Sequence, residues 1–245
     1  MSGIRKQAII SSILVYIGVL FGVVNNYFFV KDGSFLPEQY GLTRIFSDVG
    51  QNFFIFASLG AIPVLYKFFP YYQDNLHENE NDLFGRTLLM SFIGCILVGI
   101  GGYLLEPLFI QKFSNRSLLF VQYYFWVFPF AFGLLFFSLL EGYAWALQKT
   151  ILSNFLRETV LRMLTTVIIL LYYFRLIDFR AFMVCFSLLY LVIASILLVY
   201  LIRTGHLKFQ FTKSRVTKKF YKKMFTMQGL IFGGIIITTI GSTID

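Results

Sequence analysis

The chain has 245 residues, of which 58% are apolar and only 13% are charged, whereas ordinary soluble domains contain about 25% charged residues. So few charges cannot cover a water-facing surface, which excludes a soluble globular domain and indicates a membrane protein. The net charge of +9 comes from cations placed between apolar runs. Because these cations form no surface interleaved with aromatic and polar side chains, we expect no nucleic-acid partner.

Seven apolar stretches meet or approach the length of about 20 residues that a membrane-spanning helix needs. In chain order they are residues 8–30, 45–66, 87–105, 117–140, 151–174, 181–202 and 225–244. The first is charge-free and longer than the ~7–15 apolar residues of a signal peptide, so we predict a retained helix. The weakest is 151–174, because Arg157, Glu158 and Arg162 occupy its first half.

The predicted fold is all-α, a polytopic membrane bundle of six transmembrane helices forming one lobe, plus the start of a seventh. Residues 1–202 form the lobe, 203–224 a basic cytoplasmic linker, and 225–245 the first helix of a second lobe that is missing from the sequence. With the amino terminus in the cytoplasm, 15 of the 21 Lys and Arg fall in inner segments and 6 in outer segments. This positive-inside bias predicts that orientation.

The basic segment that follows the sixth stretch contains no acidic residue. Its Val216, Phe220 and Met224 recur every fourth residue, on one face of a helix. Two interpretations stay open: a short helix lying on the anionic inner leaflet, or a solvated loop that serves only to orient the chain.

No constellation of catalytic or metal-binding residues is found. His77 and His206 fall in predicted loops, and Cys95 and Cys185 fall inside apolar runs, where a thiol behaves as a small hydrophobic group. The sequence lacks HExxH, phosphate-binding glycine loops and nucleophile-elbow motifs. We therefore predict neither an enzyme nor a cofactor or metal site.

Charges at membrane depth are costly and mark functional candidates. Glu158 and Arg162 have the i,i+4 spacing of a salt bridge, which leaves Arg157 without an obvious local partner. A guanidinium near the inner mouth of a bundle suits bidentate phosphate binding, and Lys67 adds a second cation. The alternative is ordinary positive-inside flanking. Glu141, near the inner end of the fourth stretch, either reaches headgroup water or faces a central cavity.

Small and kinking residues predict how some helices pack. Gly18 and Gly22 form a small-xxx-small pair, which favours close helix contact. Pro63 and Pro129 fall inside the second and fourth stretches, where each is expected to kink its helix.

Three parts of the chain carry a family resemblance. They are residues 3–7 leading into the helix with Gly18 and Gly22 and then residues 36–42; residues 58–60 followed by 66–70; and residues 140–143 through Lys149 to Arg157, Glu158 and Arg162. These resemble the polysaccharide-biosynthesis flippases of the multidrug/oligosaccharidyl-lipid/polysaccharide exporter superfamily, which include O-antigen and lipid-linked oligosaccharide flippases. The resemblance spans essentially the whole chain, as the first half of a family member plus one helix.

The resemblance implies flipping of an undecaprenyl-diphosphate-linked sugar, such as a lipopolysaccharide precursor, across the cytoplasmic membrane. Lys67, Arg157 and Arg162 match positions where cavity cations attract the diphosphate. The expected partners are membrane lipids and a second lobe or another copy of the chain, which is needed to complete the cavity. Two alternatives stay open. One is a cation-coupled multidrug exporter, which requires a carboxylate at membrane depth; the first helix speaks against it, because its only strongly polar groups are Asn25 and Asn26. The other is a truncated half that transports nothing.

Overall fold

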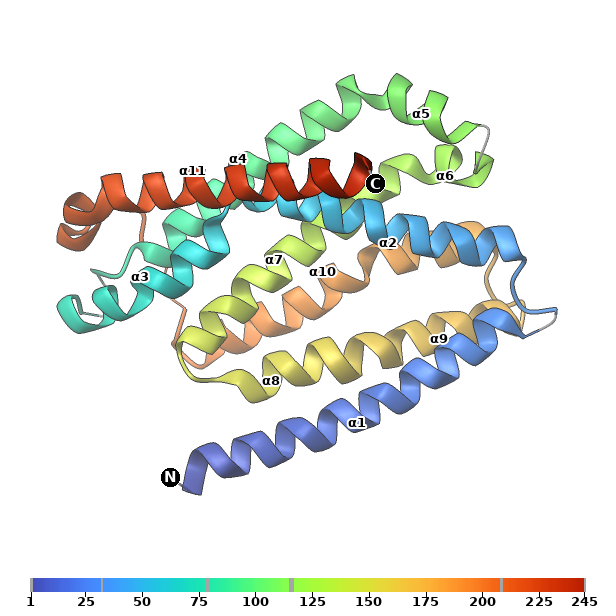
Figure 1. Ribbon diagram of the computed structural model, residues 1–245. Helices are drawn as coiled ribbons and strands as arrows, with labels where there is room; N and C mark the ends of the chain where they lie inside the picture. The colour runs from blue at the N-terminus through green and yellow to red at the C-terminus, as the bar shows by residue number, and fades with distance from the viewer. Residues whose placement is uncertain (1, 32, 78–79, 115–116, 208, 245) are drawn as a thin grey trace.

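The computed structural model describes residues 2–31, 33–77, 80–114, 117–207 and 209–244, and within these ranges it is helical, with no strand. The elements, in chain order, are α1 Ser2–Val30, α2 Pro37–Ser58, α3 Ala61–Asn75, α4 Leu83–Leu104, α5 Glu106–Ser114, α6 Leu118–Tyr123, the 3₁₀ turn η2 Tyr124–Trp126, α7 Val127–Ala146, α8 Thr150–Asn154, the π-helical turn η3 Phe155–Val160, α9 Leu161–Tyr173, α10 Phe179–Arg203 and α11 Arg215–Ile244 (Figure 1). The all-α prediction is confirmed for these residues.

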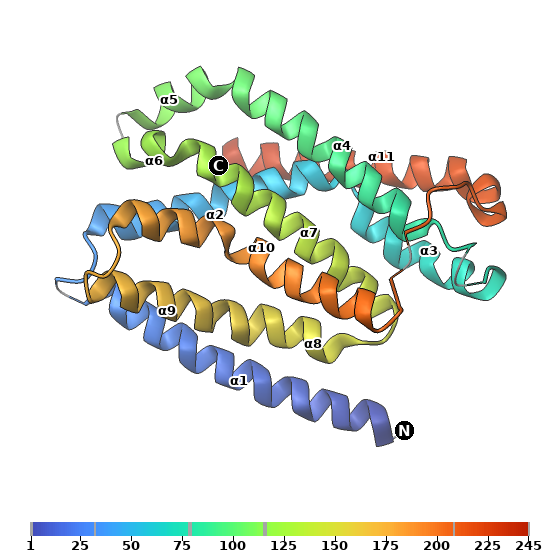
Figure 2. The ribbon, with the colours of Figure 1, turned by 180° about the vertical axis from the view of Figure 1, so that it is seen from behind.

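Helices α7 and α10 pack along each other at the centre of the bundle, with α1, α8 and α9 on one side and α2, α3 and α4 on the other (Figures 1 and 2). Aromatic side chains fill the interfaces: Phe130 of α7 stacks on Phe186 of α10, with ring centroids 5.7 Å apart. Phe46 of α2 and Phe137 of α7 are fully buried. Among lipid tails, such close packing rather than the hydrophobic effect holds helices together.

Among the residues that the structure describes, four helical segments are long and apolar enough to cross a membrane: Ile9–Val30, Leu83–Leu104, Leu118–Ala146 and Phe179–Arg203. The bent pair α2 and α3 makes a fifth if it is one span. Large apolar side chains are exposed on these helices, such as Leu20 of α1 at 67% and Leu97 of α4 at 56%. Exposed apolar surface of this kind is typical of contact with lipid, and the chain is compatible with a multi-pass membrane protein.

The second predicted stretch is bent, and the bend lies just before Pro63. The α2 and α3 axes meet at 47°, and the break lies at Leu59 and Gly60, whose φ angles are 45° and 72°. Pro63 follows in the first turn of α3, where its missing N–H breaks no helical hydrogen bond. The predicted kink of this stretch is therefore present three to four residues before Pro63, where the positive φ angles of Leu59 and Gly60 form it. Gly60 is needed both for its positive φ and because an added Cβ would lie 3.2 Å from the Gln228 carbonyl oxygen in α11.

The fourth predicted stretch departs from α geometry directly before its proline. Residues Tyr124–Trp126 form a 3₁₀ turn between α6 and α7, and Pro129 follows three residues later. Proline has no N–H to donate to the carbonyl four residues earlier, that of Phe125, so the regular helix is interrupted there.

The connections gather at the two ends of the bundle. The turns after α1 and α9 lie at one end, where Lys31 Nζ hydrogen-bonds the Tyr173 hydroxyl at 3.1 Å. The turns after α3, α7 and α10 lie at the other end, together with the start of α11 (Figure 1). Successive long helices therefore cross the bundle in alternating directions, which is the arrangement that the count of inner and outer cations assumed.

The basic segment differs from both of its interpretations. Helix α11 begins at Arg215 and continues to Ile244, so it runs through the predicted boundary between linker and seventh helix. Val216 and Met224 are buried, and the Phe220 ring packs 5.2 Å from that of Tyr71 in α3. The apolar face thus covers α3 instead of a leaflet or solvent, because α3 presents an aromatic surface to it.

A buried carboxylate fixes the start of α11 to α4. Asp82, fully buried, accepts hydrogen bonds from the Ser214 backbone N–H at 3.2 Å, from the Thr217 hydroxyl at 2.8 Å and from Arg86 Nε at 2.6 Å. The Tyr72 hydroxyl lies 2.7 Å from that of Thr217 and extends the network to α3. Three helices are therefore joined at one end of the bundle.

Candidate functional site

The candidate site is built around the π-helical turn Phe155–Val160, which joins α8 to α9 and contains Arg157 and Glu158. Such turns widen a helix locally and are frequent at functional sites. Helix α1 lies directly against this turn: a Cβ on Gly18 would lie 2.0 Å from the Glu158 carbonyl oxygen, and one on Gly22 would lie 3.3 Å from Arg162 Nη1. The predicted packing role of these two glycines is confirmed.

Polar contacts hold α1 on the turn. The Thr159 hydroxyl donates to the Leu14 carbonyl at 2.7 Å, and Asn25 Nδ2 donates to the Arg162 carbonyl at 3.1 Å. The Thr166 hydroxyl donates to Asn25 Oδ1 at 2.6 Å. Asn25 therefore joins helices α1 and α9, and both ends of its amide are used within the bundle.

Two ion pairs lie at this turn. Arg162 Nη2 is 2.9 Å from Glu158 Oε2, which confirms the predicted i,i+4 pair. Arg157 Nη1 is 2.7 Å from Glu141 Oε2 in α7. The prediction that Arg157 lacks a partner considered only its own helix and is wrong, because the partner lies 16 residues earlier on a neighbouring helix.

The Glu141–Arg157 pair is asymmetric. The Glu141 side chain is 4% exposed, so it faces the bundle interior and does not reach headgroup water, whereas the Arg157 side chain is 47% exposed. Within the described part of the chain, Glu141 Oε1 is buried without a hydrogen-bond partner. A guanidinium has five N–H donors, and the bond to Glu141 uses one of those on Arg157. Arg157 therefore keeps donors for a second anion.

Lys67 lies on the exposed face of α3 and is not joined to these ion pairs. Its neighbour Tyr66 is also exposed and packs against α7, where a Cβ on Gly142 would lie 3.3 Å from the Tyr66 hydroxyl. On the opposite flank of α3, Tyr71 packs against α11. Lys67 is exposed, and no ion pair involving it is found among the residues that the structure describes.

The structure therefore brings Glu141 and Arg157 together, places Arg162 beside them through Glu158, and keeps Lys67 apart on α3. The sequence did not identify Tyr66, which packs against Gly142, the residue that follows Glu141. The missed pairing had a signal. Glu141 directly follows the fourth apolar stretch and Arg157 lies in the fifth, their charges are opposite, and neither had a partner in its own helix. Buried charges are normally paired, so a search between helices identifies them.

The site offers groups that can bind an anion. The positive charges of Arg157 and Arg162 balance the negative charges of Glu141 and Glu158. Of these four side chains, that of Arg157 is the most exposed. Over the described ranges, no group of three or more His, Cys, Asp and Glu converges. No family model matches the chain, and no curated protein or solved structure matches it.

Proposed function

We propose that this chain forms one lobe of a transporter that flips a lipid-linked oligosaccharide, with a sugar joined through diphosphate to a polyprenyl lipid such as undecaprenyl, across the cell membrane. The observation that carries the proposal is Arg157, a guanidinium that is half exposed and is held in place by the buried Glu141. Arg162, one turn further, offers a second guanidinium with 36% of its side chain exposed.

The chemistry of the substrate matches both parts of this region. A guanidinium binds phosphate oxygens with paired hydrogen bonds, more specifically than an ammonium does. A polyprenyl tail needs a continuous apolar surface, and α1 presents Tyr16, Leu20 and Tyr27 with at least 60% exposure. Arginine for the diphosphate and an apolar helix face for the tail therefore lie on neighbouring elements.

In this proposal the lobe has six membrane crossings with the amino terminus in the cytoplasm. The crossings are α1, α2 with α3, α4, α6 with α7, α8 with α9, and α10, and α11 begins a seventh. The 15-to-6 division of Lys and Arg supports this orientation. Transport then needs a second lobe or another copy, because alternating access arises when one bundle rocks against another.

The proposal predicts that Arg157→Ala, made in the complete reading frame, lowers surface glycan in a flippase-deficient strain that the wild-type gene rescues. Loss of hydrogen bonds to a charged group costs about 1.5–3 kcal/mol, so we expect export to fall roughly 10- to 100-fold. Arg180→Ala is the matched control, because Arg180 is an exposed cation at the start of α10. Equal export by the two variants at equal protein level would remove Arg157 from the mechanism.

Glu141 favours one second candidate, a cation-coupled multidrug exporter, which requires a carboxylate at membrane depth. The buried Oε1 of Glu141 is such a group, although it lies in α7 and not in α1. The same strain separates the two functions through dye efflux. The flippase proposal predicts that efflux is unchanged by Glu141→Gln, whereas the exporter predicts that efflux is lost while glycan export stays absent in every variant.

A further inference from the structure

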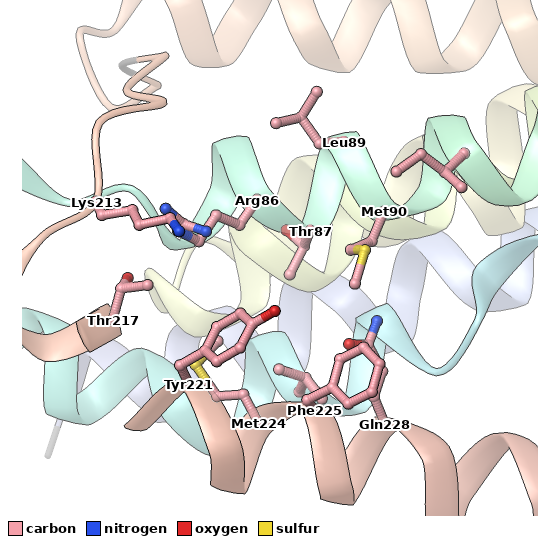
Figure 3. Close-up of a pocket in the computed structure, with 12 residues that line it drawn as sticks. Arg86, Thr87, Leu89, Met90, Lys213, Thr217, Tyr221, Met224, Phe225 and Gln228 are labelled. Carbon is pink, nitrogen blue, oxygen red and sulfur yellow. The ribbon is translucent and has the colours of Figure 1, made fainter. Parts of the chain in front are cut away.

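A second site lies between α4 and α11. A pocket of about 270 Å³ opens there, and no residue of the two ion pairs at the π-helical turn lines it. Its walls come from the first half of α4, from the start of α11 and the segment before it, and from Val64 of α3 (Figure 3). The pocket therefore lies where α11 docks onto the rest of the bundle.

One end of the pocket is cationic. The side chains of Lys213 and Arg86 extend toward one another there (Figure 3). Asp82 holds Arg86 through Nε, and the two terminal guanidinium nitrogens have no hydrogen bond within the described part of the chain. Lys213 is exposed, with Nζ 5.8 Å from the centroid of the Tyr221 ring. Two cations against one carboxylate leave an excess positive charge at this end.

The other end is apolar. Met90 and Ile93 of α4 face Met224 and Phe225 of α11. Ile93 follows Arg86 by seven residues, a rise of about 10 Å along a helix. Ile93 and Phe225 are 47% and 59% exposed, so this end opens onto the apolar outer surface of α4, where Leu97 continues it.

The cationic and apolar ends of the pocket follow one another in the same order as the headgroup and the acyl chains of a membrane lipid. Both α4 and α11 begin at the same end of the bundle (Figure 1), and α4 is one of the membrane-spanning candidates. The charges at the helix starts are thus at the bilayer interface, and the apolar end is at hydrocarbon depth. Basic pockets between transmembrane helices suit anionic lipid headgroups.

We propose that this pocket binds an anionic phospholipid, with its phosphate at Arg86 and Lys213 and the first part of one acyl chain against Met90, Ile93 and Phe225. The volume is just below the range of about 300–1,000 Å³ for small-molecule pockets, so the rest of the lipid lies along the exposed surface of α4. A bound lipid contacts α4 and α11 together and stabilises their docking. This inference does not depend on the flippase proposal, because it uses none of that site's residues.

The test compares lipids on the detergent-purified chain. Phosphatidylglycerol, phosphatidylcholine and inorganic phosphate are each titrated while thermal unfolding is followed, and retained lipid is identified by native mass spectrometry. Binding to the folded state raises the melting temperature, so we expect a rise with phosphatidylglycerol, little with phosphatidylcholine, and one retained anionic lipid per chain.

Two variants and a control locate the effect. Lys213→Gln removes a pocket cation without disturbing Asp82, and we expect about fivefold weaker binding of phosphatidylglycerol, the factor for about 1 kcal/mol per cation near an anionic surface. Met90→Trp fills the apolar end and should weaken binding by blocking the chain. Lys222→Gln makes the same charge change on α11 outside the pocket lining and should leave binding unchanged.

Several results would overturn the lipid site. Equal stabilisation by phosphatidylcholine would mean that charge plays no part, and equal stabilisation by phosphate alone would mean that the apolar end plays none. An equal loss in Lys222→Gln and Lys213→Gln would indicate diffuse surface attraction. If the chain is a dimer and none of the three additives changes its melting temperature, a second copy fills the pocket instead of a lipid.

Discussion

Gly18 determines how closely α1 approaches the π-helical turn. The glycine leaves room for the Glu158 carbonyl, since an added Cβ would lie only 2.0 Å from its oxygen. No real contact of that kind is tolerated, so any side chain at this position must push α1 away from the turn. The contacts that depend on this approach, Thr159 to Leu14 and Asn25 to Arg162, would lengthen together.

We therefore predict that Gly18→Ala lowers the free energy of unfolding by about 1–3 kcal/mol, the usual cost of overpacking. Gly99→Ala in α4 is the matched control: its added Cβ would meet nothing within 4 Å, and alanine is favoured over glycine inside a helix by roughly 0.5–1 kcal/mol. Thermal unfolding in detergent measures both. If the two variants melt at the same temperature, α1 is not packed on the turn as described.

Asp82 has a corresponding role where α3, α4 and α11 meet, and it lies outside the candidate spans. Burial alone would raise its pKa, but hydrogen bonds from Ser214, Arg86 and Thr217 outweigh burial and lower the pKa from 3.8. A carboxyl group whose pKa is lower in the folded protein than in the unfolded chain stabilises the fold at any pH above its unfolded pKa. That stabilisation is lost as the pH falls through the folded pKa. The Asp82 network thus contributes fully above about pH 4.

The prediction is a pH-dependent gap between wild type and Asp82→Asn. Above about pH 4 we expect the variant to be less stable by about 1–3 kcal/mol, as for a disrupted buried hydrogen-bonded group. Below that pH the gap should narrow, because protonation removes the same charge from the wild type. Asp178→Asn serves as the comparison, since Asp178 is exposed and caps α10 at the opposite end. A gap that stays constant down to pH 2 would contradict the role given to the Asp82 charge.

At the scale of elements, hydropathy located the apolar helices well and the interruptions poorly. Residues 8–30 and 181–202 match α1 and α10 closely, because long apolar runs have few alternatives to a helix in lipid. The bend between α2 and α3 was placed at Pro63, whereas it depends on the left-handed backbone of Leu59 and Gly60. Gly60 permits a positive φ, but the local sequence does not show that α11 packs so close that a Cβ there would lie 3.2 Å from the Gln228 carbonyl oxygen.

Helix α11 and the site show the same limit. The spacing of Val216, Phe220 and Met224 correctly indicated one apolar helical face, but not that α3 covers it. Of the four candidate site residues, the charges in apolar stretches were found because such charges are rare. The Glu158–Arg162 pair was predicted from its i,i+4 spacing. The Glu141–Arg157 pair was not, because it joins two helices and sequence spacing gives contacts only within one helix.

At the scale of the molecule, one end of the bundle combines the candidate transport residues with the docking of α11. Arg157 follows the turn between α7 and α8, and the Asp82 network and the α4–α11 pocket lie at the same end (Figure 1). Under the proposed function and orientation, this end faces the cytoplasm, and a diphosphate-linked precursor would be loaded there. In that proposal flipping needs two lobes, whereas loading needs only the cations and the apolar surface of this one.

Substrate binding therefore tests the central claim most directly, and it does so even if the chain alone cannot transport. The measurement is the equilibrium affinity of the detergent-purified chain for a fluorescent polyprenyl-diphosphate sugar, with polyprenol lacking phosphate as competitor. We predict saturable binding that the competitor does not displace and that Arg157→Ala weakens by roughly 10- to 100-fold, with Arg180→Ala unchanged. Equal affinity of Arg157→Ala and wild type, or full displacement by polyprenol, would contradict it.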